Sequence, residues 1–136
     1  MMHRFPIRVY YEDTDLAGIV YYANYLKFTE RARSEWLRDL GVDQLAMKRD
    51  AGVVFVVRRI EADYLAPAQF DDLLQIESRL HEIGQARITM CQKVLREGRV
   101  LFSLVVTLVC MSARGRPVRL PAELIQRMAP ASPGCI

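Results

Sequence analysis

The sequence predicts one α+β domain in which a single long helix packs against one face of an antiparallel five-stranded sheet. One apolar stripe at helical spacing runs through residues 23–40, five stretches have strand character, and tight turns join most of the later ones. A chain of 136 residues that is 51% hydrophobic can bury one proper core and is too short for two. We therefore expect residues 1–136 to form one domain, with a frayed tail at about 129–136.

The first strand is expected at residues 5–11. Apolar side chains alternate there from Phe5 to Tyr11, and Pro6 indicates either the beginning of a strand or the edge of a sheet. The following residues, 12–18, are rich in Asp and end in glycine, which is typical of a loop.

The long helix is expected at about residues 23–40, because apolar side chains recur there at steps of three and four. Asn24 is a plausible N-cap, although the helix could also start earlier, and Gly41 supplies the stop. A second, short helical turn is expected at 45–50.

Four further strands follow. The first begins with the run Val53–Val57, whose unbroken apolar character predicts burial on both faces. Gly84-Gln85 and Glu97-Gly98 predict tight hairpin turns, so these strands should be antiparallel. A last short helix is expected at 121–128. The predicted strands are 53–65, 73–83, 87–96 and 100–113.

Composition excludes several classes of protein. The net charge of +3 is spread along the chain, whereas nucleic-acid binding usually shows a denser basic patch. Three cysteines are too few and too widely spaced for a disulfide framework or a zinc site. The N-terminus lacks the features of a signal peptide, and the longest apolar run is shorter than a membrane span. These observations predict a cytoplasmic protein with no nucleic-acid partner.

The chemistry is expected where the acidic loop meets the long helix. Glu12, Asp13 and Asp15 lie within four residues, and Gly18 allows positive φ or a close approach of ligand to backbone. Free N–H groups at a helix N-terminus can polarise a carbonyl and stabilise its oxyanion, while a carboxylate attacks the carbonyl or activates a water. Such a site can hydrolyse an activated acyl group. We expect no metal, because further ligands at suitable spacing are lacking.

The motif residues support a family assignment. Tyr11-Glu12-Asp13-Thr14-Asp15, followed by Gly18-Ile19-Val20-Tyr21-Tyr22, resembles the 4-hydroxybenzoyl-CoA thioesterase-like branch of the hotdog superfamily, in particular its Tol–Pal-associated acyl-CoA thioesterases. Softer matches, at residues 24–33 and 63–72, extend the likeness over nearly the whole chain. The resemblance implies a hotdog fold, a homodimer that often forms a homotetramer, sites at subunit interfaces, and a possible peripheral link to a membrane-associated complex. It implies no cofactor, since coenzyme A belongs to the substrate.

The same resemblance assigns roles to residues. Asp15 would be the catalytic carboxylate, the backbone N–H of Tyr22 would polarise the thioester carbonyl, and Gly18 would shape the loop. The family often has a histidine at the position of Tyr22, and the exchange keeps the backbone donor but loses any imidazole role. Thr14 and Asn24 either orient the loop or act as local caps.

Other residues are candidates for substrate contact or for catalysis. Tyr25 is expected in the core or along the substrate tunnel. Arg87 is our candidate for binding the phosphates of coenzyme A, with Arg58 and Arg59 as weaker ones. Glu30 could be an alternative base, although an ion pair with a neighbouring arginine explains it as well.

The function predicted is hydrolysis of acyl-CoA, with short aliphatic acyl groups as the expected substrates. Alternatives are an aromatic acyl-CoA or acyl-carrier-protein thioesterase, a hotdog dehydratase or hydratase, and a non-catalytic acyl-thioester-binding scaffold. The dehydratase chemistry usually places a histidine in the active loop, and none occurs between Arg4 and Leu80.

Overall fold

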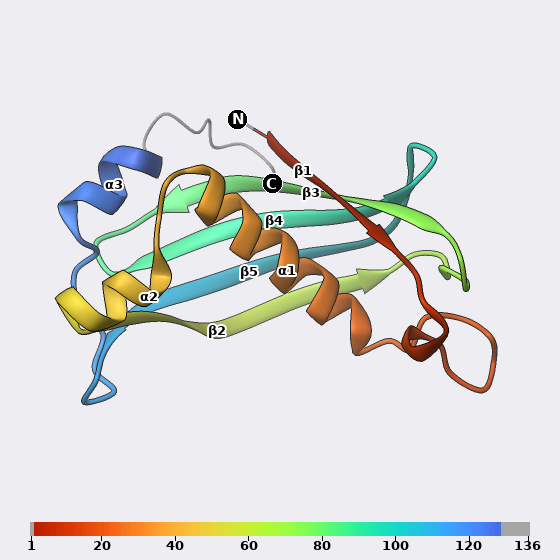
Figure 1. Ribbon diagram of the computed structural model, residues 1–136, viewed down its shortest axis with the longest axis horizontal. Helices are drawn as coiled ribbons and strands as arrows, with labels where there is room; N and C mark the ends of the chain where they lie inside the picture. Colours follow the sequence, from red (N-terminus) through yellow and green to blue (C-terminus); the bar gives the residue numbers. More distant parts are fainter. Residues whose placement is uncertain (1, 129–136) are drawn as a thin grey trace.

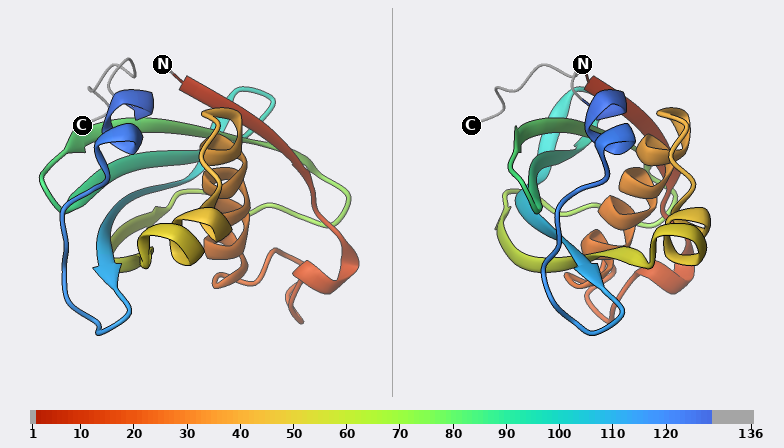
Figure 2. Two further views of the ribbon diagram at one scale, coloured as in Figure 1. Left: turned by 60° about the vertical axis from the view of Figure 1, so that its left-hand side comes forward. Right: turned by 90° about the vertical axis from the view of Figure 1, so that its left-hand side faces the viewer.

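The computed structural model describes residues 2–128, and in them one long helix, α1 (Asn24–Asp39), lies across one face of a five-stranded sheet (Figure 1). The strand order is β1-β3-β4-β5-β2, and each neighbouring pair is antiparallel. The sheet curves around α1 (Figure 2), so the predicted hotdog arrangement is confirmed. The strands are β1 (Met2–Arg8), β2 (Val53–Tyr64), β3 (Leu73–Ile83), β4 (Arg87–Arg96) and β5 (Arg99–Ser112).

The core lies between α1 and the concave face of the sheet. Phe28, Ala32 and Trp36, at steps of four, are buried on the inner side of α1, and Ile76 and Met90 are buried on β3 and β4. Burying one large apolar side chain contributes roughly 1.5–3 kcal/mol, so this stripe supplies most of the energy that docks the helix. The helix ends as predicted, because Gly41 has a φ of 81° and its N–H donates to Arg38 O at 2.9 Å.

β1 differs from its predicted bounds, because it runs from Met2 to Arg8 rather than over residues 5–11. Within residues 2–128 its one partner strand is β3, so it is an edge strand, which explains how Pro6 is tolerated inside it. Tyr11 was expected on the buried side of the strand. It lies instead in a 3₁₀ turn, η1 (Tyr11–Asp13), with 81% of its surface exposed.

β2 forms the other edge of the sheet, and here the expectation of burial on both faces is wrong for the single chain. Of the run that starts this strand only Val53 is buried, and Val57 is 49% exposed. The reason is topological: β2 pairs with β5 on one side, and no strand in residues 2–128 covers its other side. Burial along this run therefore falls from Val53 through three half-buried residues to the exposed Val57 at a sheet edge.

The turns and short helices match the sequence closely. Glu97 and Gly98 both have positive φ, as a tight hairpin turn between β4 and β5 requires. After α1 the chain forms α2 (Gln44–Ala46) and a π-helical turn, η2 (Met47–Ala51), and it closes with α3 (Ala122–Met128). None of the helices in the described part of the chain is long and apolar enough to cross a membrane. The predicted tail lies outside the described residues.

Candidate active site

The acidic loop folds back on itself at the start of α1. The Asp15 N–H donates to Ile19 O at 2.9 Å, and the Tyr21 N–H donates to Asp13 O at 2.9 Å. These bonds hold residues 13–15 beside residues 19–21. Gly18 makes the reversal with a φ of 80°, and its N–H donates to Asp15 O at 3.0 Å. The loop is therefore ordered by its own backbone, as the glycine suggested.

A second segment, just before β3, supports the loop from the side. The Val20 N–H donates to Ala68 O at 2.8 Å, and Ile19 forms an isolated antiparallel bridge with Gln69. Both Val20 and Ala68 are buried. The loop that carries the carboxylates is thus held by hydrogen bonds to the segment that leads into β3.

The three carboxylates of the loop have different environments. Glu12 is exposed, and the Asp13 carboxylate accepts the Tyr10 N–H at 2.8 Å, which caps the 3₁₀ turn. Asp15 is half-buried, and its Oδ1 accepts the Ala17 N–H at 2.9 Å. Within residues 2–128 its Oδ2 receives no hydrogen bond. Asp15 is therefore the carboxylate that is both held in place and open on one oxygen.

Asp15 lies close to the pair of tyrosines that leads into α1. The rings of Tyr21 and Tyr22 have centroids 4.9 Å apart. The pKa of Tyr21 is raised, chiefly by its hydrogen bond and charge interaction with Tyr22 and, to a smaller extent, by the negative charge of Asp15. The carboxylate thus acts electrostatically on the residues next to the helix start.

α1 begins with unused backbone donors. Ala23 occupies the N-cap position and supplies no side-chain cap, and the Tyr22 N–H has no acceptor within residues 2–128. The suggestion that Asn24 is the N-cap is wrong: its Nδ2 donates to Asp13 O at 2.9 Å and so ties the helix to the acidic loop. Thr14 acts locally, because its Oγ1 donates to Tyr11 O at 2.7 Å. The helix start can therefore still receive an oxyanion.

Tyr25 lies in the core rather than on an open surface. Its ring is 3% exposed and stacks on Phe102 at a centroid distance of 4.8 Å. Its hydroxyl accepts the Ala68 N–H at 3.1 Å, and burial raises its pKa. Contact between Tyr25 and substrate stays a prediction, whereas its packing role is visible in this structure.

The structure also shows a partner that the sequence did not indicate. The hydroxyl of Tyr64, at the end of β2, donates to Tyr22 O at 2.9 Å. The two residues are 42 positions apart, so no local pattern could have paired them. Only the register of β2 against β5, which sets Tyr64 opposite Phe102, brings this hydroxyl to the helix start.

Arg87 lies at the other end of the sheet from Asp15. It lines a surface groove of about 710 Å³ together with Arg58, on an apolar floor that includes Val109, Met111 and Pro117. Arg59 does not line the groove and forms an ion pair with Glu61 at 2.6 Å. The structure therefore brings two of the three predicted arginines together.

The separation of this groove from the acidic loop follows from the strand register. Arg87 is aligned with Val109 and, through it, with Val56, whereas Tyr64 at the other end of β2 contacts Tyr22. Val56 and Tyr64 are eight residue steps apart along the strand, which is about 26 Å. Within one chain, the groove and the loop are therefore far apart.

Glu30 forms an ion pair on the surface of α1, which is the second of the two roles predicted for it, the first being that of a catalytic base. Its carboxylate accepts Arg33 Nη2 at 3.0 Å and the Ser34 hydroxyl at 2.8 Å. No three His, Cys, Asp or Glu side chains of residues 2–128 gather as metal ligands would. The expected absence of a metal stays a prediction.

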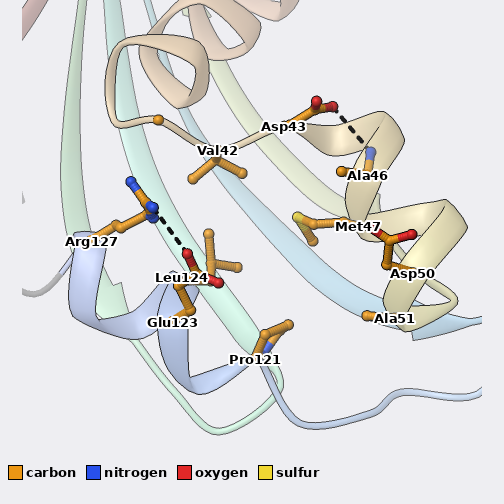
Figure 3. A pocket seen from close by; sticks show the side chains of 11 residues that line it. Val42, Asp43, Ala46, Met47, Asp50, Ala51, Pro121, Glu123, Leu124 and Arg127 are labelled. Atoms are coloured by element: carbon orange, nitrogen blue, oxygen red, sulfur yellow. Dashed lines mark hydrogen bonds and ion pairs between the residues drawn. The ribbon is translucent and has the colours of Figure 1, made fainter.

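A separate pocket of about 250 Å³ lies between α3 and the segment that holds α2 and η2 (Figure 3). Its polar side chains already have partners: Asp43 accepts the Ala46 N–H at 3.0 Å, and Glu123 pairs with Arg127 at 2.9 Å. It contains none of the residues predicted for the site, so the loop at the start of α1 remains the candidate active site.

Comparison with known proteins identifies the family of this chain. The model of the thioesterase-like superfamily matches residues 9–128. The chain is 40% identical over 121 residues to the acyl-CoA thioesterase YbgC of Haemophilus influenzae, covering 88% of this chain and 89% of that protein. It is 37% identical over 126 residues to the acyl-CoA thioester hydrolase YbgC of Escherichia coli O6:H1, covering 91% and 93%.

Solved structures show the same fold. The crystal structure of a probable thioesterase from Bartonella henselae has a TM-score of 0.84 and 40% sequence identity, and the alignment covers 89% of this chain and all of that one. The 4-hydroxybenzoyl-CoA thioesterase, at 21% identity and a TM-score of 0.88, adds support for the fold alone. The chain belongs to the thioesterase-like superfamily, and it is a thioester hydrolase with the hotdog fold.

Proposed function

We propose that the protein hydrolyses acyl-CoA to a free acid and coenzyme A, with Asp15 as the catalytic carboxylate and the Tyr22 N–H as the oxyanion donor. The observation that carries the proposal is the placement of a half-buried Asp15, open on Oδ2, beside a helix start whose Tyr22 N–H is unused. The relatives named above are acyl-CoA thioesterases.

The chemistry can proceed by either of two routes. As a general base, Asp15 takes a proton from a water molecule, whose oxygen attacks the thioester carbon. The carbonyl oxygen becomes an oxyanion at the Tyr22 N–H, the C–S bond breaks, and the thiolate of coenzyme A takes up a proton. As a nucleophile, the Asp15 carboxylate attacks the thioester carbon, the C–S bond breaks and the thiolate of coenzyme A leaves, and water then hydrolyses the resulting mixed anhydride.

Substitution of Asp15 tests the assignment. Asp15→Asn keeps the shape of the side chain and removes its basicity, so kcat should fall by about 10²-fold or more with unchanged folding. Glu12→Gln is the matched control, because Glu12 is an exposed carboxylate of the same loop. An Asp15→Asn variant that folds and keeps full activity would overturn the assignment.

An isotope experiment can detect the nucleophilic route. In a single turnover in ¹⁸O-labelled water, the general-base route puts the label directly into the released acid. The nucleophilic route, when water attacks the acid's carbonyl carbon, also labels the acid. When water attacks the Asp15 carbonyl, it delivers an unlabelled enzyme oxygen to the acid and labels Asp15. Label found in Asp15 by peptide mass spectrometry establishes the anhydride.

We propose that the working unit is a dimer formed through the β2 edges. The β2 edge is unpaired within residues 2–128 and carries exposed Val57 and Tyr64. If two β2 strands pair antiparallel about their middle, the Tyr64 end of one copy lies next to the Val53 end of the other. Asp15 of one copy then approaches Arg58 and Arg87 of the other. The acidic loop of one copy and the arginine groove of the other would together form one site.

The proposed substrate is an acyl-CoA with a short aliphatic acyl group, whose phosphates meet Arg87 and Arg58 in the groove. The exposed rings of Tyr21, Tyr22 and Tyr64 near Asp15 favour an aromatic acyl-CoA as the second candidate. Hydrolysis rates for a chain-length series, together with a benzoyl-CoA derivative and an acyl carrier protein thioester, distinguish these. A homotetramer, a cytoplasmic location and a peripheral link to a membrane-associated complex remain parts of the proposal that rest on the sequence.

A further inference from the structure

The start of α1 depends on a side chain from the far end of β2. Tyr22 directly precedes the N-cap residue Ala23, so its carbonyl lies outside the helical hydrogen bonding and receives no backbone hydrogen bond within residues 2–128. The Tyr64 hydroxyl donates to it at 2.9 Å. A strand side chain thus pairs with the carbonyl next to the helix start.

The Tyr64 ring is held by an aromatic cluster. Its centroid lies 4.9 Å from that of buried Phe102, 5.6 Å from Tyr25 and 6.3 Å from Tyr22. Edge-to-face contacts of this kind restrict the ring, so the position of its hydroxyl is fixed by the core. Burial, followed by the neighbouring Tyr22 and Tyr25, raises the pKa of Tyr64 above the ordinary tyrosine value. The hydroxyl therefore stays protonated, and can donate, at neutral and mildly alkaline pH.

The hydrogen bond acts on the residue that carries the proposed oxyanion donor. Tyr22 O and the Tyr22 N–H lie on the two peptide units that flank the same Cα, so holding this carbonyl restricts ψ of Tyr22 and with it the turn that joins the loop to α1. Oxyanion donors are effective only when they are already aimed at the developing charge, and small misplacements are costly.

We propose that Tyr64 is a positioning residue for hydrolysis: its hydroxyl holds the Tyr22 carbonyl and thereby aims the Tyr22 N–H at the thioester oxygen. The proposal rests on the proposed function, because it gives Tyr64 a task only if the Tyr22 N–H is the oxyanion donor. It also links the β2 edge, the proposed dimer contact, to the catalytic turn. Tyr64 itself performs no proton transfer.

The test is the substitution Tyr64→Phe, which keeps the ring and removes the donor. We expect kcat to fall about tenfold or more, with KM within about twofold of wild type, when rates are normalised to the folded fraction measured by circular dichroism. Tyr10→Phe is the matched control, because Tyr10 is an exposed tyrosine at the same end of the molecule. A role in stability alone would lower the unfolding temperature and leave kcat of the folded enzyme unchanged, and that result would overturn the proposal.

If Tyr64→Phe does not fold, a second variant can still test the role of the Tyr64 hydroxyl. With 3,5-difluorotyrosine at position 64 the phenol ionises at lower pH, so kcat should decline as pH rises through that ionisation, while the wild-type rate does not. An identical pH profile in both proteins would overturn the proposal. Absence of hydrolysis in the wild type, with every acyl-CoA of the series, would instead reject the proposed function itself.

Discussion

Arg33 Nη1 donates a 2.7 Å hydrogen bond to Gln92 Oε1 beneath α1, where the two residues are 5% and 0% exposed. The Gln92 amide in turn donates to Thr29 O and to Ser78 Oγ, both at 2.9 Å. This buried network ties one position of α1 to β3 and β4. Burial lowers the pKa of Arg33, and the adjacent Glu30 opposes that shift. The network therefore fixes where the helix sits on the sheet at the cost of burying a charge.

Removing the amide should destabilise the fold strongly. Gln92→Leu leaves Arg33 Nη1 and Ser78 Oγ without their partner in the core, so we expect a loss of about 2–4 kcal/mol in the free energy of unfolding. Urea denaturation measures it, and Gln75→Leu, at an exposed position of β3, is the control. A Gln92→Leu variant as stable as wild type would show that the network contributes nothing net.

Substitutions at Gly18 can show whether the loop requires a glycine for its positive φ or for lack of space. Its φ is 80°, and an added Cβ would meet no atom within 4 Å. We therefore expect Gly18→Ala to cost about 1–2 kcal/mol and to lower activity, and Gly18→Asn to be milder, since Asn tolerates positive φ better. Thermal unfolding and hydrolysis rates check the order. Asn being the worse of the two would mean that the loop needs room rather than positive φ.

The groove arginines should act on coenzyme A through its phosphates. Arg87→Ala and Arg58→Ala should each raise KM about tenfold or more, as expected for a lost charged hydrogen bond, with kcat nearly unchanged. Arg59→Ala is the control, because Arg59 is already paired with Glu61. With acyl-pantetheine, which lacks the nucleotide, none of the three changes should matter. Equal effects on both substrates would place the arginines in a structural role.

The β2 edge should control the oligomeric state. Val57→Lys puts a charge on an exposed apolar position of this edge, so we expect it to weaken the proposed dimer and to lower activity in parallel. Leu45→Lys, in α2 and 77% exposed in the chain, is the control. Sedimentation velocity gives the mass of each variant. A dimer that survives Val57→Lys with wild-type affinity would argue for a different interface.

Cys110 should make stability fall at alkaline pH. The side chain is buried, and burial raises the pKa of its thiol. In the unfolded chain the thiol ionises near pH ~8.5, whereas in the folded chain it stays protonated to higher pH. Unfolding is therefore favoured as pH rises above about 8.5, by up to ~1.4 kcal/mol per pH unit until the folded thiol also ionises. Cys110→Val should remove this part of the slope, and an unchanged slope would contradict the assignment.

The sequence by itself determined the long helix, the antiparallel strands and the residues of the acidic loop. Helical and strand periodicity are properties of neighbouring residues, and so are the glycines that end α1 and turn the loop. The motif around Asp15 is also continuous in the chain. These features could therefore be predicted without coordinates, and the hotdog fold and the thioesterase-like superfamily are confirmed.

Only the tertiary structure decided how distant segments meet. It placed Tyr64 against Tyr22 O, put the run Val53–Val57 on an edge strand where Val57 is exposed, and paired the Asn24 side chain with Asp13 O. It also set Arg58 beside Arg87, far from Asp15 within one chain. Apart from the Asn24–Asp13 contact, which joins two parts of one loop, these features depend on strand order and register, which are fixed by packing between segments tens of residues apart and leave no local signal in the sequence.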